Sequence, residues 1–286
     1  MNQTQDFTKG VIWKQLLFFF FPILIGSFFQ QLYNTVDTII VGQAVGTSAL
    51  AAVGSTGNLT NLIVNFYVGL STGASVVIAQ YYGAQNNKKI HQAVHTSYIL
   101  AIVSGILMML FGLFFSYQCL DAIGTPHDIL NDATLYMQLY FLCMIPGAIY
   151  NIGAGILRAV GDSKRPLYYL IVCSIVNVVF DFIFVVIFHQ GIAGAAIATV
   201  IAQSVCAILV TIQLMRTNEV YKLTLSKMKF HLPVLKKIIM IGAPAGIQST
   251  MYSISNIVLQ SHINAFGTQT IASWSVYVKI DALFWM

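Results

Sequence analysis

The sequence has very little charge. Only 8% of its 286 residues are Asp, Glu, Lys or Arg, whereas 57% are hydrophobic. Soluble domains carry about 25% charged residues, which they need in order to cover their surface. This shortage excludes an ordinary soluble domain and predicts a multi-pass α-helical protein of a lipid bilayer, in which each span takes about 20 apolar residues.

Metal-ligand and disulfide patterns are also missing. The six histidines have no ligand spacing, and the four cysteines lie in or beside apolar stretches without a disulfide-like arrangement. We therefore expect no cofactor other than a coupling ion. The first twelve residues are polar and no cleavage-site pattern follows a short apolar core, so we expect no removable signal peptide. The cysteines are Cys119, Cys143, Cys173 and Cys206.

Long stretches without charge define the expected helices. Asp37 is the only charged residue between Lys14 and Lys88, and none lies between Lys237 and Lys279. Dividing these stretches at Gly, Pro, Asn and polar clusters predicts seven spans and the start of an eighth. They cover residues 15–41, 49–82, 94–117, 129–157, 166–188, 191–215 and 235–263, and the eighth begins near Thr270.

The basic residues fall almost entirely on one side of this predicted topology. Every Lys and Arg except Lys279 lies in a loop or helix end of that side, whereas the opposite loops hold Asp121, Asp128 and Asp132. Basic loops stay in the cytoplasm, so the N-terminus and the loop around residues 219–237 are expected there. The net charge of +5 is then explained by contact with anionic lipid headgroups, and no nucleic-acid partner is expected.

Two segments of the chain are similar to each other. Residues 13–34 and 235–256 align without gaps, and both begin with a basic residue and contain a central proline. A repeat of six helices is even, so both copies enter the membrane from the same side, as in transporters built from parallel repeats. The identical pairs are Lys14 with Lys236, Pro22 with Pro244, Ile25 with Ile247, Ser27 with Ser249 and Asn34 with Asn256.

This repeat predicts the domain organisation. We expect an all-α membrane protein with a six-helix N-terminal bundle at residues 1–215, a cytoplasmic linker at 216–233, and the first helices of a second, repeat-related bundle at 234–286. The sequence stops inside an apolar helix, so we expect about four helices of the second bundle to lie beyond it.

Two isolated acids, Asp37 and Asp181, lie inside the predicted spans. A carboxylate at membrane depth is costly and usually marks a transport path. By helical rise both acids lie roughly 10–12 Å below the outer surface, on different helices. Two neighbouring buried carboxylates with amide and hydroxyl oxygens around them can take up a proton or Na⁺. The polar neighbours at helical spacing or matching depth are Tyr33, Asn34, Asn177 and Thr199.

Each of these residues also has a purely structural interpretation. Either acid can be a satisfied structural group, and Asn34 or Thr199 can simply hydrogen-bond neighbouring helices. Pro22 removes a backbone hydrogen bond from the first helix and can act as a hinge or as a static kink. Lys279 and Asp281 belong either to a second-bundle site or to ion pairs with helices beyond the sequence.

Several motifs together resemble the MATE (multidrug and toxic compound extrusion) family. They are PILIGSFFQQLYNTVDTIIVGQAVGTSALAAVG in the first two helices, RAVGDSKRP after the fourth, NVVFDFIFVV in the fifth and APAGIQSTMYSISN in the seventh. The resemblance implies twelve helices in two lobes around a central cavity, and export of organic cations driven by H⁺ or Na⁺.

The resemblance also assigns roles to individual residues. It implies that Asp37 and Asp181 form the acidic pair of the N-terminal lobe, that Tyr33, Asn177 and Thr199 surround this pair, and that Pro22 permits bending. In the second copy of the repeat, the position equivalent to Asp37 is Leu259, so the acidic site is expected in one lobe only.

We therefore expect a cation-coupled antiporter of the cell membrane that exports organic cations by alternating access, and not an enzyme. A lipid-linked oligosaccharide flippase of the same superfamily is the alternative, kept open by Lys279, since such cargo is anionic. An intramembrane aspartyl protease would need a G-x-G-D motif, and the nearest match, Val160-Gly161-Asp162, lacks the first glycine. Nothing resembles the filter or charged ring of a passive channel.

Overall fold

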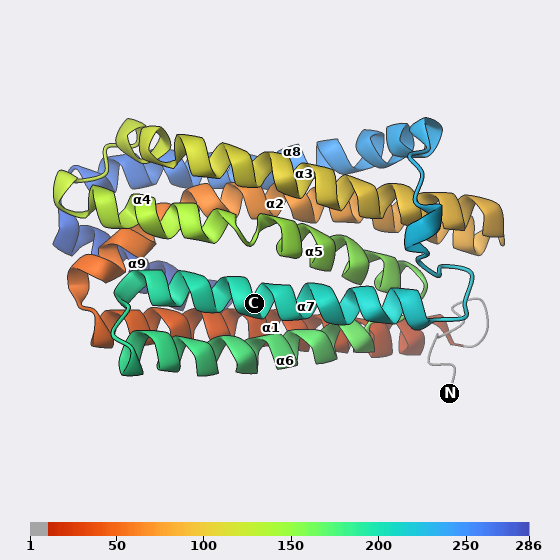
Figure 1. The fold of residues 1–286 in the computed structure, drawn as a ribbon, viewed down its shortest axis with the longest axis horizontal. Coiled ribbons are helices and arrows are strands. Elements are labelled where there is room, and N and C mark those ends of the chain that lie inside the picture. Colours follow the sequence, from red (N-terminus) through yellow and green to blue (C-terminus); the bar gives the residue numbers. More distant parts are fainter. Residues whose placement is uncertain (1–10, 286) are drawn as a thin grey trace.

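The computed structural model describes the backbone of residues 11–285, all of it helical apart from short connections. The expected cytoplasmic N-terminus at residues 1–10 lies outside the described residues. The helices run side by side along one long axis (Figure 1). They are α1 (Ile12–Ala44), α2 (Thr47–Gly83), α3 (Asn87–Ala122), α4 (His127–Phe141), α5 (Met144–Ala159), α6 (Lys164–Asp181), α7 (Gly191–Arg216), α8 (Leu232–Asn264) and α9 (Thr268–Trp285), with a π-helical turn, η1 (Phe182–Ile187), and a short 3-10 turn, η2 (Leu225–Lys227).

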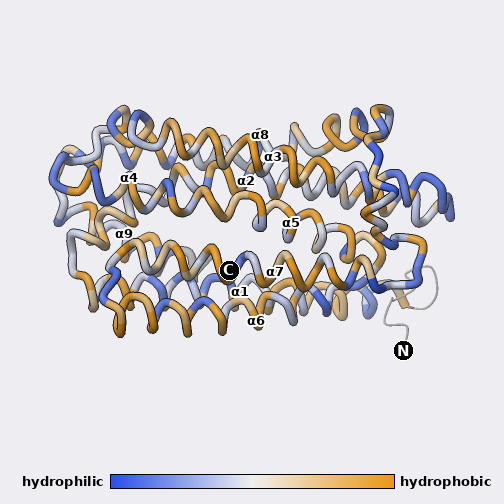
Figure 2. Tube along the Cα trace, in the orientation of Figure 1, coloured by the Kyte–Doolittle hydropathy of each residue, from blue (hydrophilic) through white to orange (hydrophobic). Residues whose placement is uncertain are grey.

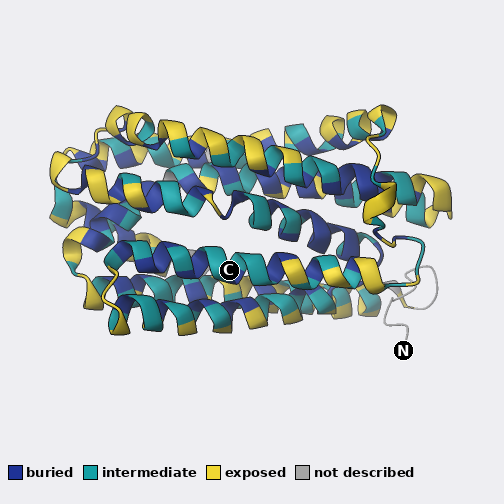
Figure 3. Ribbon diagram, viewed as in Figure 1, coloured by how far each residue is buried: buried dark blue, intermediate teal, exposed yellow. Residues whose placement is uncertain are grey.

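The distribution of side chains is that of a membrane protein. Phe114 and Met251 are 71% and 66% exposed, whereas Asn177 and Asp181 are 1% and 0% exposed. Apolar residues dominate the middle of the bundle and polar residues its two ends (Figure 2), and the buried residues lie on the inner helix faces (Figure 3). In a bilayer the helices satisfy their own backbone groups and apolar side chains can face lipid. The chain is therefore an all-helical membrane bundle.

Within the described residues, α1, α2, α3, α6 together with η1, and α7 are each long and apolar enough to cross a membrane, and α4 with α5 makes a sixth such unit. These correspond to the six spans predicted for the first bundle. The loops α1–α2, α3–α4, α6–α7 and α8–α9 lie at one end of the molecule, and the connections α2–α3, α5–α6 and α7–α8 lie at the other, whereas the α4–α5 connection lies in the middle of the bundle (Figure 1). The two ends therefore divide the acidic from the basic loops.

The prediction of one helix over residues 129–157 is wrong. The chain forms α4 and α5 with a bend of 46° between them. Pro146 lies in the first turn of α5, where it offers no N–H to the carbonyl of Leu142 and its ring would clash with that carbonyl. Pro22 and Pro244, by contrast, lie inside the helices α1 and α8 without ending them.

Helix α2 packs against α8 along a seam of small residues. Gly69 and Gly73 face Gly246 and Gly242, and a Cβ atom added to Gly69 would lie 2.2 Å from the Cα of Gly246. Both helices thus carry a G-x-x-x-G pattern, which lets two backbones approach closely inside a membrane. This α2–α8 seam joins the helices that precede the connection at residues 217–231 to the helices that follow it.

Polar contacts at both ends of the molecule attach the segments after α7 to the helices before it. At the acidic end, the Thr268 hydroxyl donates to Asp128 at 2.5 Å and the Asn264 amide donates to the carbonyl of Ile123 at 2.9 Å. At the basic end, the backbone N–H of Thr224 in the linker donates to His95 Nε2 at 3.1 Å. The linker is therefore docked on the first bundle.

Candidate functional site

Asp181 ends the regular part of α6 and is completely buried. Neither of its carboxylate oxygens has a hydrogen-bond partner among the described residues, and the same is true of Asn177 Oδ1 one turn earlier. The Asn177 amide lies 3.5 Å from the Thr199 hydroxyl on α7, which itself donates to the carbonyl of Ala195 at 3.1 Å. The result is a group of buried oxygens that lack donors.

The chain widens into a π-helical turn immediately after Asp181. The N–H of Phe188 donates to the carbonyl of Ile183 at 2.9 Å, a spacing of five residues in place of four. Single π turns interrupt α-helices rarely and often at functional positions. The prediction of one regular helix over residues 166–188 is therefore wrong at its end, where residues 182–187 form this turn. It places the carboxylate at a discontinuity of the helix.

Asp37 on α1 is the second acid of the site, and it is less buried than Asp181. Its Oδ1 is buried without a hydrogen-bond partner in the described part of the chain. The carboxylate interacts electrostatically with Asp181, and it acts on the hydroxyls of Tyr136 and Tyr140 on α4. The structure therefore brings together the two acids that the sequence singled out, on the adjoining helices α1 and α6.

Asp37 also faces a central cavity of about 380 Å³. Tyr33, Asn34 and Pro22 line the same cavity from α1, whereas Asp181, Asn177 and Thr199 are not among its lining residues. The predicted site is thus divided into an inner group around Asp181 and a cavity wall formed by α1. Pro22 lies in an unbroken helix, so its role as a hinge stays a prediction.

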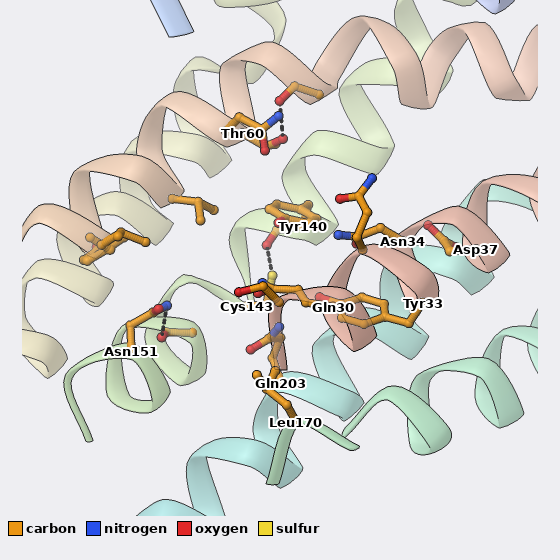
Figure 4. Close-up of a pocket in the computed structure, with 18 of the residues that line it drawn as sticks. Gln30, Tyr33, Asn34, Asp37, Thr60, Tyr140, Cys143, Asn151, Leu170 and Gln203 are labelled. Carbon is orange, nitrogen blue, oxygen red and sulfur yellow. Dashed lines mark hydrogen bonds between the residues drawn. The ribbon is translucent and has the colours of Figure 1, made fainter. Parts of the chain in front are cut away.

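The walls of the cavity are aromatic and polar. Figure 4 shows Gln30, Tyr33 and Asn34 of α1 beside Tyr140 and Cys143 from the α4–α5 bend. Amide, hydroxyl and aromatic groups on the remaining walls come from the helices α2, α4, α5, α7, α8 and α9. They include Thr60, Tyr67, Tyr136, Asn151, Gln203 and Trp274.

Three charged side chains line the cavity within the described residues: Asp37, Arg158 and Lys279. Arg158 lies in the last turn of α5 at the basic end, and Lys279 lies in α9. Arg158 was expected only among the cytoplasmic charges, and Gln203 was not singled out by the sequence. Tyr136 and Tyr140 are among the aromatic residues suited to the wall of a cavity for organic cations, but packing or contact with lipid is the more common role of such residues, so the sequence alone did not assign them to the cavity.

Comparison with known proteins agrees with this architecture. The MatE family model matches residues 22–183, more than half of the chain. The probable multidrug resistance protein YoeA of Bacillus subtilis strain 168 is 28% identical over 295 residues, covering 98% of this chain and 63% of that protein. The chain thus spans less than two thirds of the length of such relatives.

Solved structures show the same fold. The inward-facing conformation of a multidrug resistance MATE family transporter of the MOP superfamily is similar with a TM-score of 0.83 and 28% identity, over 89% of this chain and 58% of that one. A MOP superfamily transporter from Pyrococcus furiosus, described by the reverse polarity of its binding pocket, gives a TM-score of 0.79 and 28% identity over 84% and 53% of the two chains. The extent of the family match and the shared helical fold show that this chain belongs to the MatE family.

Proposed function

We propose that this chain provides the ion-binding lobe and the start of the second lobe of a cell-membrane exporter with a cytoplasmic N-terminus. In this proposal H⁺ or Na⁺ enters the Asp37–Asp181 site, and an organic cation leaves the cell in exchange by alternating access. The observation that carries the proposal is the pair of interacting carboxylates beside a central cavity, Asp181 completely buried and Asp37 with one buried oxygen, whose buried oxygens lack hydrogen-bond donors among the described residues.

Buried oxygens without hydrogen-bond partners can serve as ligands for a transported cation. A buried carboxylate without a donor bears its full desolvation cost, and a bound proton or Na⁺ removes that cost. Both oxygens of Asp181, Oδ1 of Asn177 and Oδ1 of Asp37 are available. Na⁺ is a hard cation and takes oxygen ligands of this kind, and a proton needs only one carboxylate. The same residues therefore serve either coupling ion.

The cavity suits a flat organic cation. Its volume of about 380 Å³ lies in the range of small-molecule sites. Tyr140 and Trp274 offer aromatic faces on which a delocalised cation can lie, and Asp37 supplies the opposite charge. The similarity to YoeA, a probable multidrug resistance protein, and to a multidrug resistance MATE family transporter of known structure supports this choice of cargo.

A lipid-linked oligosaccharide flippase is the second candidate. Arg158 and Lys279 put two positive charges on the cavity wall, and anionic pyrophosphate would pair with them. The reverse pocket polarity described for the Pyrococcus furiosus transporter, a structure of similar fold, is an example of how cargo can differ within one superfamily. Binding of ethidium compared with that of a lipid-linked pyrophosphate separates the two candidates.

The test uses the complete protein in proteoliposomes, with ethidium as cargo and imposed Na⁺ or pH gradients. Asp37→Asn and Asp181→Asn should each abolish gradient-driven efflux and leave ethidium binding to the purified protein measurable. Asp132→Asn is the matched control, because it removes an exposed acid at the outer end of α4 and should transport normally. Normal efflux by Asp37→Asn or Asp181→Asn under the gradient that drives the wild type would overturn the proposal.

A further inference from the structure

Lys279 is a positively charged residue of the cavity wall, and it lies on α9 in the proposed second lobe. It lies on α9, eleven residues after the helix begins at Thr268, which is roughly 16 Å along the axis. Asp37 lies seven residues before α1 ends, roughly 10 Å from the same end of the molecule. Both side chains line the one central cavity, so they face each other across the boundary between the lobes.

The two charges act on each other at a distance. Asp37 and Lys279 interact electrostatically, yet they form no direct ion pair among the described side chains. Asp181 and the hydroxyls of Tyr136 and Tyr140 also face Asp37, and Arg158 lines the cavity from the basic end. Asp281 follows Lys279 by two positions and therefore projects from a different side of α9.

Lys279 is thus placed where its ammonium group could compete with a transported cation for Asp37. Its ammonium group sits on a flexible four-carbon stem, so it can approach Asp37 or withdraw from it without movement of the helix backbone. In a low-dielectric cavity a unit charge is felt over several ångströms. Because the pair straddles the lobe boundary, its separation changes whenever α9 moves relative to α1.

We propose that Lys279 is a tethered cation that competes with the transported H⁺ or Na⁺ for Asp37, and so links occupancy of the acidic site to the position of the second lobe. This inference rests on the proposed function of Asp37. When the acidic site is empty, attraction between Asp37 and Lys279 draws α9 towards α1. When a cation occupies the site, the attraction is lost and α9 is released.

Competition by Lys279 determines the direction in which its removal should change the ion dependence of transport. Without the lysine charge, Asp37 should bind its cation more tightly. Lys279→Met keeps a side chain of similar length without the charge, and it should reach half-maximal ethidium efflux at a cation concentration at least tenfold lower, corresponding to about 1.4 kcal/mol. In a pH titration this is a midpoint at least one unit higher. Lys279→Arg, which keeps the charge, should behave more like the wild type.

Two further variants make the result specific. Lys236→Met removes a lysine charge from α8, the other described helix of the second lobe, at an exposed position outside the cavity, and it should leave the midpoint unchanged. In an Asp37→Asn background, which lacks gradient-driven efflux, adding Lys279→Met should restore neither efflux nor cation binding, because the partner of the lysine charge is already absent. The measurement is efflux of ethidium by the complete protein in proteoliposomes, over a Na⁺ series at fixed pH and a pH series without Na⁺.

A second readout covers variants that fold but do not transport. Binding of Na⁺ and of protons to the purified protein is titrated directly, with choline replacing Na⁺, and Lys279→Gln is measured beside Lys279→Met. A folded, charge-free variant that binds both cations with wild-type affinity, while Asp37→Asn loses binding, overturns the role of Lys279 and leaves the proposed function standing. Wild-type cation binding by Asp37→Asn overturns the proposed function itself.

Discussion

The α2–α8 seam can be tested by adding a single methyl group. In Gly69→Ala the new Cβ atom would lie 2.2 Å from the Cα and 2.3 Å from the N of Gly246, whereas ordinary contact begins near 3.4 Å. The obstructing atoms are backbone atoms and have no rotamer that would move them away. The two helices must therefore separate by about an ångström, which also loosens the contact between Gly73 and Gly242.

The expected cost lies at the upper end of the range for overpacked cores, about 3 kcal/mol. At roughly 2–4 °C per kcal/mol for a chain of this size class, the melting temperature should fall by about 6–12 °C. The buried free thiols Cys143, Cys173 and Cys206 provide the readout, because a thiol-reactive fluorophore reports their exposure on heating.

Gly57→Ala is the matched control on the same helix. A Cβ atom at Gly57 meets nothing within 4 Å, so the added methyl group should leave the melting temperature unchanged or raise it, since alanine favours a helix by up to about 1 kcal/mol. Equal melting temperatures for Gly69→Ala and the wild type would refute the close backbone approach of α2 and α8.

Three further changes have defined outcomes. Asp181→Asn removes a buried charge that has no described hydrogen-bond partner, so it should raise the free energy of unfolding by about 1–3 kcal/mol in the same melting assay. His95→Ala removes the acceptor of the Thr224 N–H, and trypsin should then cleave the linker several-fold faster because about 1–2 kcal/mol of docking is lost. Pro146→Ala restores the N–H missing at the α4–α5 bend, so the helix should straighten past Leu142, and ethidium should bind about tenfold more weakly, a loss of about 1.4 kcal/mol.

Each of these expectations has a contrary outcome. A lower melting temperature for the acid variant would mean that its carboxylate has a stabilising partner. Wild-type proteolysis of the histidine variant would mean that the linker is held elsewhere, and unchanged ethidium affinity of the proline variant would mean that the bend does not shape the cavity. The matched controls are Asp132→Asn, His127→Ala and Pro233→Ala. His127 is exposed at the end of the molecule opposite the linker, and Pro233 lies in the first turn of α8, where proline is harmless.

The helical spans were predictable because charge is so scarce in this chain. An apolar run bounded by lysines has few alternatives to a membrane helix, so the six spans of the first bundle follow from counting. The break between α4 and α5 was missed although Pro146 was visible, because Pro22 and Pro244 occupy helices that do not break. Proline marks where a break can occur, and the packing around it decides whether it does.

The site was predictable only in its charged part. Asp37 and Asp181 stand out because each is a single acid within a long uncharged run. Tyr136 and Gln203 do not stand out, since neutral polar residues are common on helices that pack against one another. The π turn after Asp181 leaves no pattern in an almost uniformly apolar segment. The geometry that isolates the carboxylate is therefore visible only in three dimensions.

The arrangement of charges restricts how ion binding can be communicated to the second lobe. Asp37 and Asp181 are carried by α1 and α6, which pack against each other, so a rigid-body movement of the lobes about the α2–α8 seam leaves the separation of the two acids unchanged. The same movement changes the separation between Asp37 and Lys279, because α9 belongs to the proposed second lobe. A ligand shifts a conformational equilibrium only through an interaction that differs between the two conformations. Among the described charged groups of the cavity, the pair across the lobe boundary meets this condition, and the acidic pair alone does not.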